Sequence, residues 1–134
     1  MNFAKYIGLP FQTHGRGPAY DCWGLVRLFY KQEFGIELPC FISEYGHERD
    51  IIGITKTVDS ARPFWSPVVF PRIGDVILCR INAFPLHTGI MINRSTMLHI
   101  TKNINSCVES IHGPVWSNRI EGFFRYVDFP FHTA

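Results

Sequence analysis

The segment that decides the fold is Asp21-Cys22-Trp23-Gly24-Leu25-Val26, which opens a stretch of helical character ending at Gly35. Asp21 is a good N-cap residue, and Gly35 suits the left-handed position that commonly ends a helix. Apolar residues recur at helical spacing and form one stripe, made of Cys22, Leu25, Val26, Phe29, Tyr30 and Phe34. The sequence therefore predicts one amphipathic helix from about Asp21 to Gly35.

Downstream of Gly74 the pattern changes to short runs of β-type residues bounded by turn residues. We expect strands at Asp75–Ile81, His87–Ile92, Thr96–Thr101, Ser106–Ile111 and Glu121–Val127. One helix followed by consecutive strands is an α+β layout, in which the helix packs on an antiparallel sheet of about five or six strands.

The region between the helix and these strands carries no clear periodicity. Residues 37–71 contain Pro63, Pro67 and Pro71, so we expect an irregular insertion, with a short helix within Glu44–Thr57. At 134 residues the chain is predicted to form a single domain over residues 1–134.

Composition excludes several classes of partner. The net charge of +2 and the lack of a Lys/Arg stripe argue against a nucleic-acid partner. No apolar run approaches the roughly 18 to 20 residues that span a bilayer, so we expect no membrane span. The start, Met1–Tyr6, lacks the apolar segment of a secretory signal, which favours synthesis in the cytoplasm without a signal peptide.

Cys22 is the first candidate for chemistry among the four cysteines. At a helix start, unpaired N–H groups and the helix dipole favour an anion, so we expect a lowered thiol pKa. The same N–H groups could form an oxyanion hole. Position alone leaves open whether Cys22 is a nucleophile or a small core residue. No C-x-x-C pair occurs, so no metal site is expected, and we assign the remaining cysteines to the core: Cys40, Cys79 and Cys107.

Two histidines supply the base that a thiol nucleophile needs. If Asn93–Ser95 is a three-residue hairpin loop, His87 and His99 become diagonal neighbours on one face of the sheet. A two-residue loop would place them on opposite faces. The catalytic interpretation therefore predicts an odd-numbered loop or a bulge. The other histidines lie in loops or near the end, and only His14, which precedes Cys22 in its loop, is placed near substrate.

The motifs together resemble the NlpC/p60 family of papain-like cell-wall peptidases, in the correct order along most of the chain. The matching segments are Gly8-Leu9-Pro10-Phe11, Asp21-Cys22-Trp23-Gly24-Leu25-Val26, Gly74-Asp75-Val76, His87-Thr88-Gly89-Ile90 and Leu98-His99. The resemblance implies a papain-like fold in which Cys22 attacks, His87 is the base and His99 orients it. It implies no metal or other cofactor. Trp23 and the ending Arg119–Tyr126 look like the tail-assembly members of tailed phages, which implies a virion protein with tail-tip partners.

Two positions depart from the family pattern. Phe11 stands where members commonly have a Tyr whose hydroxyl lines the active site. Trp23 stands where many members have a Ser that helps the preceding Asp hold a substrate amine. The resemblance assigns the amine contact to Asp21, and Trp23 is expected to narrow the cleft or stack on substrate or a neighbouring subunit.

The leading hypothesis is a cysteine hydrolase that cleaves amide bonds of peptidoglycan stem peptides. The alternative is a structural subunit of a phage tail tip that keeps the fold with little hydrolytic activity. A related acyltransferase shares the Cys/His chemistry, although the order of His after Cys favours the hydrolases.

Overall fold

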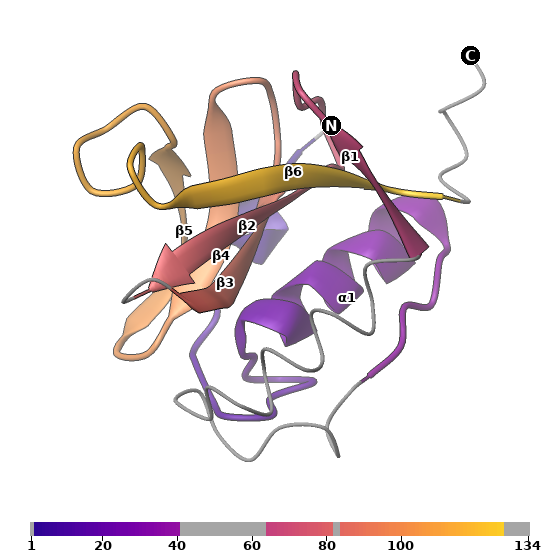
Figure 1. Ribbon diagram of the computed structural model, residues 1–134. Helices are drawn as coiled ribbons and strands as arrows, with labels where there is room; N and C mark the ends of the chain where they lie inside the picture. The colour runs from indigo at the N-terminus through magenta and orange to yellow at the C-terminus, as the bar shows by residue number, and fades with distance from the viewer. Residues whose placement is uncertain (1, 41–63, 82–83, 128–134) are drawn as a thin grey trace.

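A computed structural model describes residues 2–40, 64–81 and 84–127 (Figure 1). The described residues form a short 3-10 helix, one α-helix and six strands: η1 (Ala4–Tyr6), α1 (Cys22–Phe34), β1 (Trp65–Val68), β2 (Val76–Ile81), β3 (Phe84–Met91), β4 (Thr96–Thr101), β5 (Ile104–Ser110) and β6 (Ile120–Tyr126). The strands make one sheet in the order β1-β6-β2-β3-β4-β5, with antiparallel pairs throughout. This confirms the predicted α+β fold. The helix expected within 44–57 lies outside the described residues.

Both ends of α1 follow from local sequence signals, as predicted. Asp21 is in an extended conformation (φ −94°, ψ −176°), and its side chain accepts the Gly24 N–H. Gly35 has φ 67°, and the N–H groups of Gly35 and Ile36 donate to the carbonyls of Lys31 and Tyr30. This pattern closes the last turn of the helix around a left-handed glycine. Cys22 is therefore fixed as the first residue of α1.

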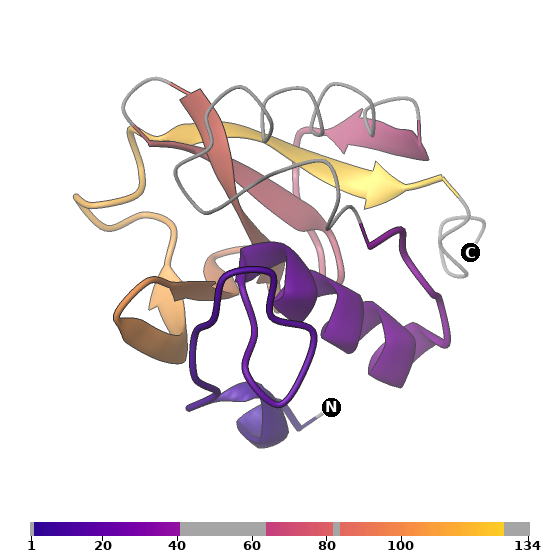
Figure 2. The ribbon, with the colours of Figure 1, turned by 90° about the horizontal axis from the view of Figure 1, so that it is seen from below.

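The helix packs along one face of the sheet (Figures 1 and 2). Its buried side chains join those of β2, β3 and β4 in one cluster that includes Leu25, Val26, Phe29, Tyr30, Val76, Ile90, Leu98 and Ile100. Side chains at alternate strand positions, Ile77, Cys79, Met91 and Met97, form a second cluster with Ile111 and Trp116 from the segment after β5. Because successive residues of a strand point to opposite faces, the central strands are buried on both sides. None of the described helices combines the length and apolar character that crossing a bilayer requires.

Strand β1 lies within residues 37–71, so the prediction of irregular structure is wrong for Trp65–Val68. This short strand pairs only with β6 among the described strands and contains Pro67. Proline has no N–H to donate, which confines it in sheets to edges such as this one. The Trp65 ring packs edge-on against Tyr126 and Tyr30, at centroid distances of 5.2 and 5.8 Å.

The β3–β4 hairpin has the register that the catalytic hypothesis requires. Met91 pairs with Met97 and Ile90 with Leu98, and the Ile92 N–H donates to the Thr96 carbonyl at 3.0 Å. The connection is thus the three residues Asn93–Ser95, as predicted. Strand β3 begins at Phe84, earlier than the expected start at His87.

Candidate active site

The start of α1 is pressed against the preceding loop. A Cβ atom at Gly24 would lie 2.1 Å from the carbonyl oxygen of Gly15, a distance that no side chain can occupy. Gly24 therefore allows this backbone contact one turn into the helix, and the contact fixes the position of Cys22 against the loop.

The Cys22 thiol does not have the lowered pKa that its helix position predicts. Burial raises the pKa of Cys22, and the negative charge of Asp21 adds to the increase. Hydrogen bonding from Thr88 and from the Trp23 amide lowers the pKa of Cys22, but by less. The physical reason is that the cost of desolvating a thiolate outweighs the effect of the partial charges at the helix end. In the free protein the thiol is the resting form.

His87 on β3 and His99 on β4 share one face of the sheet, as the hairpin register predicts. His87 Nε2 lies 2.8 Å from His99 Nδ1, and each residue is 3% exposed. The indole of Trp116 covers both rings, stacked on His87 at 5.3 Å and edge-on to His99 at 5.1 Å. The pair is therefore held rigidly and away from bulk water.

Glu109 and Trp116 are two site residues that the sequence analysis missed. Glu109 Oε2 lies 2.9 Å from His99 Nε2 and also accepts the Trp116 indole N–H at 2.5 Å. The β4–β5 register, in which His99 faces Cys107 and Met97 faces Glu109, makes Glu109 a diagonal neighbour of His99. Extending the predicted sheet by this one hairpin could have found Glu109. Trp116 lies in a loop and carries no such signal.

The protonation of the histidine pair follows from these contacts. Burial, with a smaller effect from His99, lowers the pKa of His87 to about 3, and burial lowers the pKa of His99 despite the opposing effect of Glu109. Both rings are then neutral near neutral pH. A carboxylate only accepts, so His99 carries its proton on Nε2 and accepts at Nδ1 from His87 Nε2–H. The unprotonated nitrogen of His87 is therefore Nδ1, the form that a general base needs.

Cys22 contacts Thr88, the residue that follows His87 on β3. Its thiol lies beside Thr88, whose Oγ1 is buried and makes no hydrogen bond of normal geometry within the described part of the chain. Among the described residues, no hydrogen bond joins Cys22 Sγ to the His87 ring in this resting arrangement. Catalytic hydrogen bonds often tighten only when substrate is bound.

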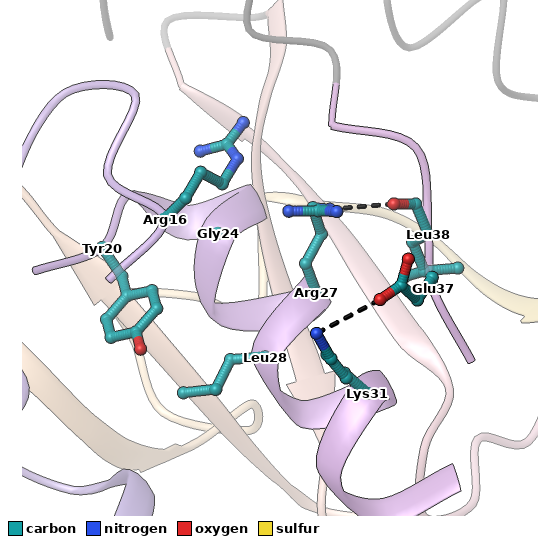
Figure 3. Close-up of a pocket in the computed structure, with 8 residues that line it drawn as sticks. All are labelled: Arg16, Tyr20, Gly24, Arg27, Leu28, Lys31, Glu37 and Leu38. Carbon is teal, nitrogen blue, oxygen red and sulfur yellow. Dashed lines mark hydrogen bonds and ion pairs between the residues drawn. The ribbon is translucent and has the colours of Figure 1, made fainter. Parts of the chain in front are cut away.

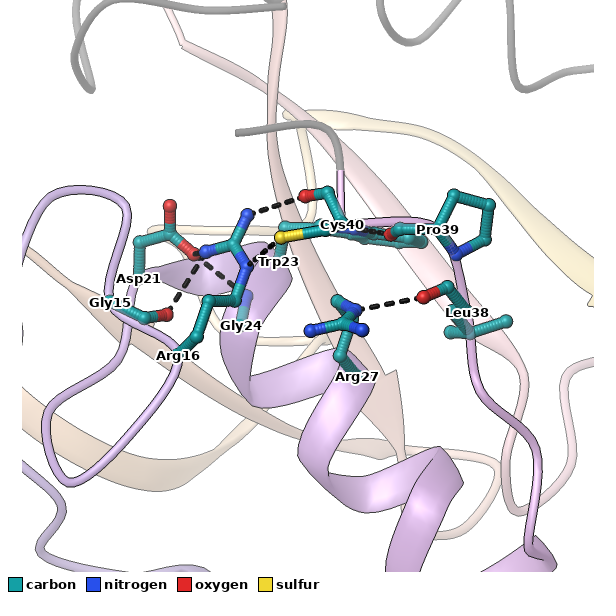
Figure 4. Close-up of polar contacts among 9 residues, drawn as sticks. All are labelled: Gly15, Arg16, Asp21, Trp23, Gly24, Arg27, Leu38, Pro39 and Cys40. Atoms are coloured by element: carbon teal, nitrogen blue, oxygen red, sulfur yellow. Dashed lines mark hydrogen bonds and ion pairs between the residues drawn. The ribbon is translucent and has the colours of Figure 1, made fainter. Parts of the chain in front are cut away.

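The carboxylate of Asp21 makes its contacts within the protein itself (Figure 4). Its Oδ1 accepts the Gly24 N–H at 2.7 Å and pairs with Arg16 Nη1 at 2.8 Å. Arg16 also donates to the carbonyls of Gly15 and Cys40, at 3.0 and 2.6 Å. A substrate amine at Asp21 would meet a carboxylate that already has a cationic partner.

The other residues predicted to contact substrate make contacts within the fold. Trp23 donates its indole N–H to Pro39 and lies edge-on to Trp65, with ring centroids 6.3 Å apart. Phe11 is partly buried and packs against the core cluster, and His14 occupies a left-handed turn position with φ 59°. Their roles toward substrate stay predictions.

The remaining cysteines divide into one core residue and two that are not. Cys79 is fully buried, as expected, whereas Cys40 and Cys107 are only half-buried, so the core prediction is wrong for both. Cys40 Sγ lies 3.2 Å from Arg16 Nε, and Cys107 lies opposite His99 on β5.

A small pocket lies on the flank of α1 (Figure 3). It is lined by residues from the preceding loop, the helix and the segment after it: Arg16, Tyr20, Gly24, Arg27, Leu28, Lys31, Glu37 and Leu38. Cys22, His87 and His99 do not line it, so this pocket is separate from the candidate catalytic groups. In this pocket Arg27 donates a hydrogen bond to the Leu38 carbonyl, and Lys31 forms an ion pair with Glu37.

The fold and the site together define an α+β protein with a helix-start cysteine and a buried histidine pair. Residues 8–125 match the NlpC/P60 family, and the chain belongs to that family. It is 27% identical over 118 residues to the murein DD-endopeptidase MepS/murein LD-carboxypeptidase of Escherichia coli (strain K12), which covers 87% of this chain and 55% of that protein. It is 28% identical over 116 residues to the tail tip assembly protein K of Escherichia phage N15, which covers 81% of this chain and 46% of that protein.

Two solved structures share the fold. The NlpC/p60 domain of the peptidoglycan hydrolase SagA has a TM-score of 0.57 and 25% identity, over 90% of this chain and 89% of that chain. An NLP/P60-family lipoprotein-like protein of Staphylococcus aureus Mu50 has a TM-score of 0.65 and 21% identity, over 92% and 38%. The chain spans about half the length of the curated relatives it matches, at 55% and 46%.

Proposed function

We propose that this chain is a cysteine hydrolase that cleaves amide bonds in peptidoglycan stem peptides. The observation that carries the proposal is the buried contact of 2.8 Å between His87 Nε2 and His99 Nδ1, continued by Glu109. This chain of contacts fixes the tautomer that leaves His87 Nδ1 free to accept a proton. Family membership and the murein endopeptidase among its relatives supply the substrate class.

The reaction divides into acylation and deacylation. His87 Nδ1 takes the Cys22 proton as Sγ attacks the amide carbonyl carbon, and the C–N bond breaks as His87 returns that proton to the leaving amine. His87 then deprotonates a water molecule, which hydrolyses the thioester and releases the carboxylate and the free thiol. Because the resting thiol has a raised pKa, proton transfer accompanies attack rather than preceding it.

Two side chains and one backbone amide support these steps. His99 holds the His87 tautomer, and Glu109 in turn holds His99, so both are positioning residues. The Asp21 side chain accepts a hydrogen bond from the Gly24 N–H, and the Asp21 carbonyl accepts one from the Leu25 N–H. The Cys22 amide is then the first-turn donor assigned to the tetrahedral oxyanion.

The test is loss of turbidity by purified sacculi. Wild type and Cys107→Ala should lyse them at similar rates, whereas Cys22→Ala should be inactive. Cys107 is the matched control because it is a half-buried thiol outside the catalytic groups. Equal lysis by Cys22→Ala and wild type would rule out the mechanism.

The second candidate function is a structural role in a phage tail tip, in a virion protein made in the host cytoplasm. The exposed apolar side chains around the β1 edge favour it: Phe64, Val69 and Phe70 are 55%, 79% and 82% exposed. Such a patch is typical of a protein interface, and one relative is a tail tip assembly protein. Both roles can coexist. Particles that assemble with Cys22→Ala but fail with Val69→Ser/Phe70→Ser would separate the two; assembly with the double variant would exclude the interface.

A further inference from the structure

Three metal-binding side chains converge on the β4–β5 hairpin, on the side of His99 that faces away from His87. Cys107 stands directly opposite His99 in the register, and Glu109 follows two residues later on the same face. One ligand atom from each of the three residues lies within 4.8 Å of those of the other two. No C-x-x-C motif marks this cluster, because pairing between β4 and β5 brings its members together.

We propose that His99, Cys107 and Glu109 form a binding site for a zinc ion, with water as the fourth ligand. Zinc takes nitrogen, sulphur and oxygen ligands at about 2.0 to 2.3 Å in a tetrahedron, which sets ligand atoms roughly 3.3 to 3.8 Å apart. His99 Nε2 and Glu109 Oε2, now 2.9 Å apart, would move slightly apart, and no ligand atom lies more than 4.8 Å from another. A thiolate and an imidazole also disfavour magnesium and calcium, which prefer oxygen ligands.

The burial of the three side chains gives the ion a route to the site. The Glu109 side chain is 45% exposed and Cys107 is half-buried, whereas the His99 side chain is 4% exposed. An ion can thus enter from solvent past Glu109 and meet His99 at the inner end. Two adjacent strands hold the ligands, so little backbone order has to be gained on binding.

Occupancy of the site would change the tautomer of the histidine pair, a consequence that rests on the proposed function. Zinc binds His99 through Nε2, which must give up its proton. A neutral His99 then carries its proton on Nδ1, received from His87 Nε2 across the 2.8 Å contact. The displaced proton is taken up by His87 at Nδ1, and the Cys107 thiol releases one proton to solvent. His87 can then no longer accept the Cys22 proton, so zinc inhibits hydrolysis reversibly.

Cobalt titration of the full chain tests the site without reference to activity. Co²⁺ bound by a thiolate gives a charge-transfer absorption band, which Zn²⁺ should abolish by displacement. We expect the band at one ion per chain in wild type and Cys22→Ala, and its loss in Cys107→Ala and in Cys107→Ser, which keeps the side-chain size. A band that survives both Cys107 substitutions, disappears in Cys22→Ala, or is absent from wild type would overturn the site.

Inhibition tests the consequence for catalysis. Cys107→Ala should keep its basal hydrolysis of sacculi and require at least tenfold more Zn²⁺ than wild type for half inhibition. Equal inhibition of the two proteins would overturn the tautomer step. If the chain hydrolyses nothing, the cobalt titration still decides the site, so failure of the proposed function is distinguished from failure of this inference.

Discussion

Arg16 Nη1 lies 2.8 Å from Asp21 Oδ1, the same carboxylate oxygen that accepts the N–H of Gly24. The Asp21 side chain therefore both caps helix α1 and neutralises a cation from the loop before it. These two roles can be separated because asparagine caps a helix as well as aspartate does but carries no charge.

Asp21→Ala should be more destabilising than Asp21→Asn, by about 1 kcal/mol, the usual contribution of an N-cap side chain. Both variants lose the ion pair with Arg16, so the difference between them isolates the cap. Urea unfolding of the two variants and wild type measures it. Equal losses for both variants would show that the cap contributes nothing.

Gly24→Ala should destabilise the protein by roughly 1 to 3 kcal/mol, since the added Cβ would overlap the Gly15 carbonyl and force the helix start away from the loop. Gly113→Ala is the matched control, because the nearest atom to its Cβ would be 3.8 Å away. Thermal unfolding of the two variants gives the comparison. If Gly24→Ala leaves the melting temperature unchanged, the helix start can move away from the loop without cost.

Alkylation of Cys22 by iodoacetamide should continue to accelerate as pH increases from about 7 to about 9. The reason is that burial and Asp21 raise the pKa of Cys22, so the reactive thiolate becomes more abundant throughout this range. Mass spectrometry of the Cys22 peptide measures the rate, and Cys22→Ala gives the background. A plateau below about pH 7 would instead indicate a preformed thiolate–imidazolium pair.

Thr88→Val should leave the protein as stable as wild type or more stable by about 1 kcal/mol, because it removes a buried hydroxyl that lacks a normal hydrogen bond. The backbone hydrogen bond from Thr88 to the Cys22 thiol, which lowers the pKa of that thiol, is kept by valine. Urea unfolding of the variant and wild type measures the difference in stability. Marked destabilisation would show that the hydroxyl has a partner.

Glu109→Ala should reduce kcat for sacculus hydrolysis by roughly 10- to 100-fold, since a hydrogen bond to a charged group is worth about 1.5 to 3 kcal/mol. Glu109→Gln should retain more activity because its carbonyl oxygen can still accept from His99. Glu121→Ala is the control: Glu121 is a partly exposed carboxylate paired with Arg80. If Glu109→Ala hydrolyses sacculi at the wild-type rate, Glu109 does not contribute to catalysis.

The sequence predicted a large part of the site because the signals involved act over short distances. The cap at Asp21 and the left-handed Gly35 fix the helix ends through contacts a few residues apart. Strand alternation limited the β3–β4 hairpin to two outcomes, and the catalytic hypothesis favoured the three-residue loop that places His87 and His99 on one face. The helix ends and this choice between two registers could be read from the chain itself.

Other features depend on residues that meet only when the chain folds. The sign of the Cys22 pKa shift depends on burial beside Thr88, 66 positions later in the printed numbering, and outweighs the local effect of the helix start. Strand β1 forms because β6 offers it an edge to pair with, although Pro67 argues against a strand locally. Trp116, which lies in a loop, likewise reaches the histidine pair only through packing. Helix capping and strand alternation were thus determined by sequence alone, whereas desolvation and charge pairing were decided by the tertiary structure, because both depend on which distant groups exclude water from a site.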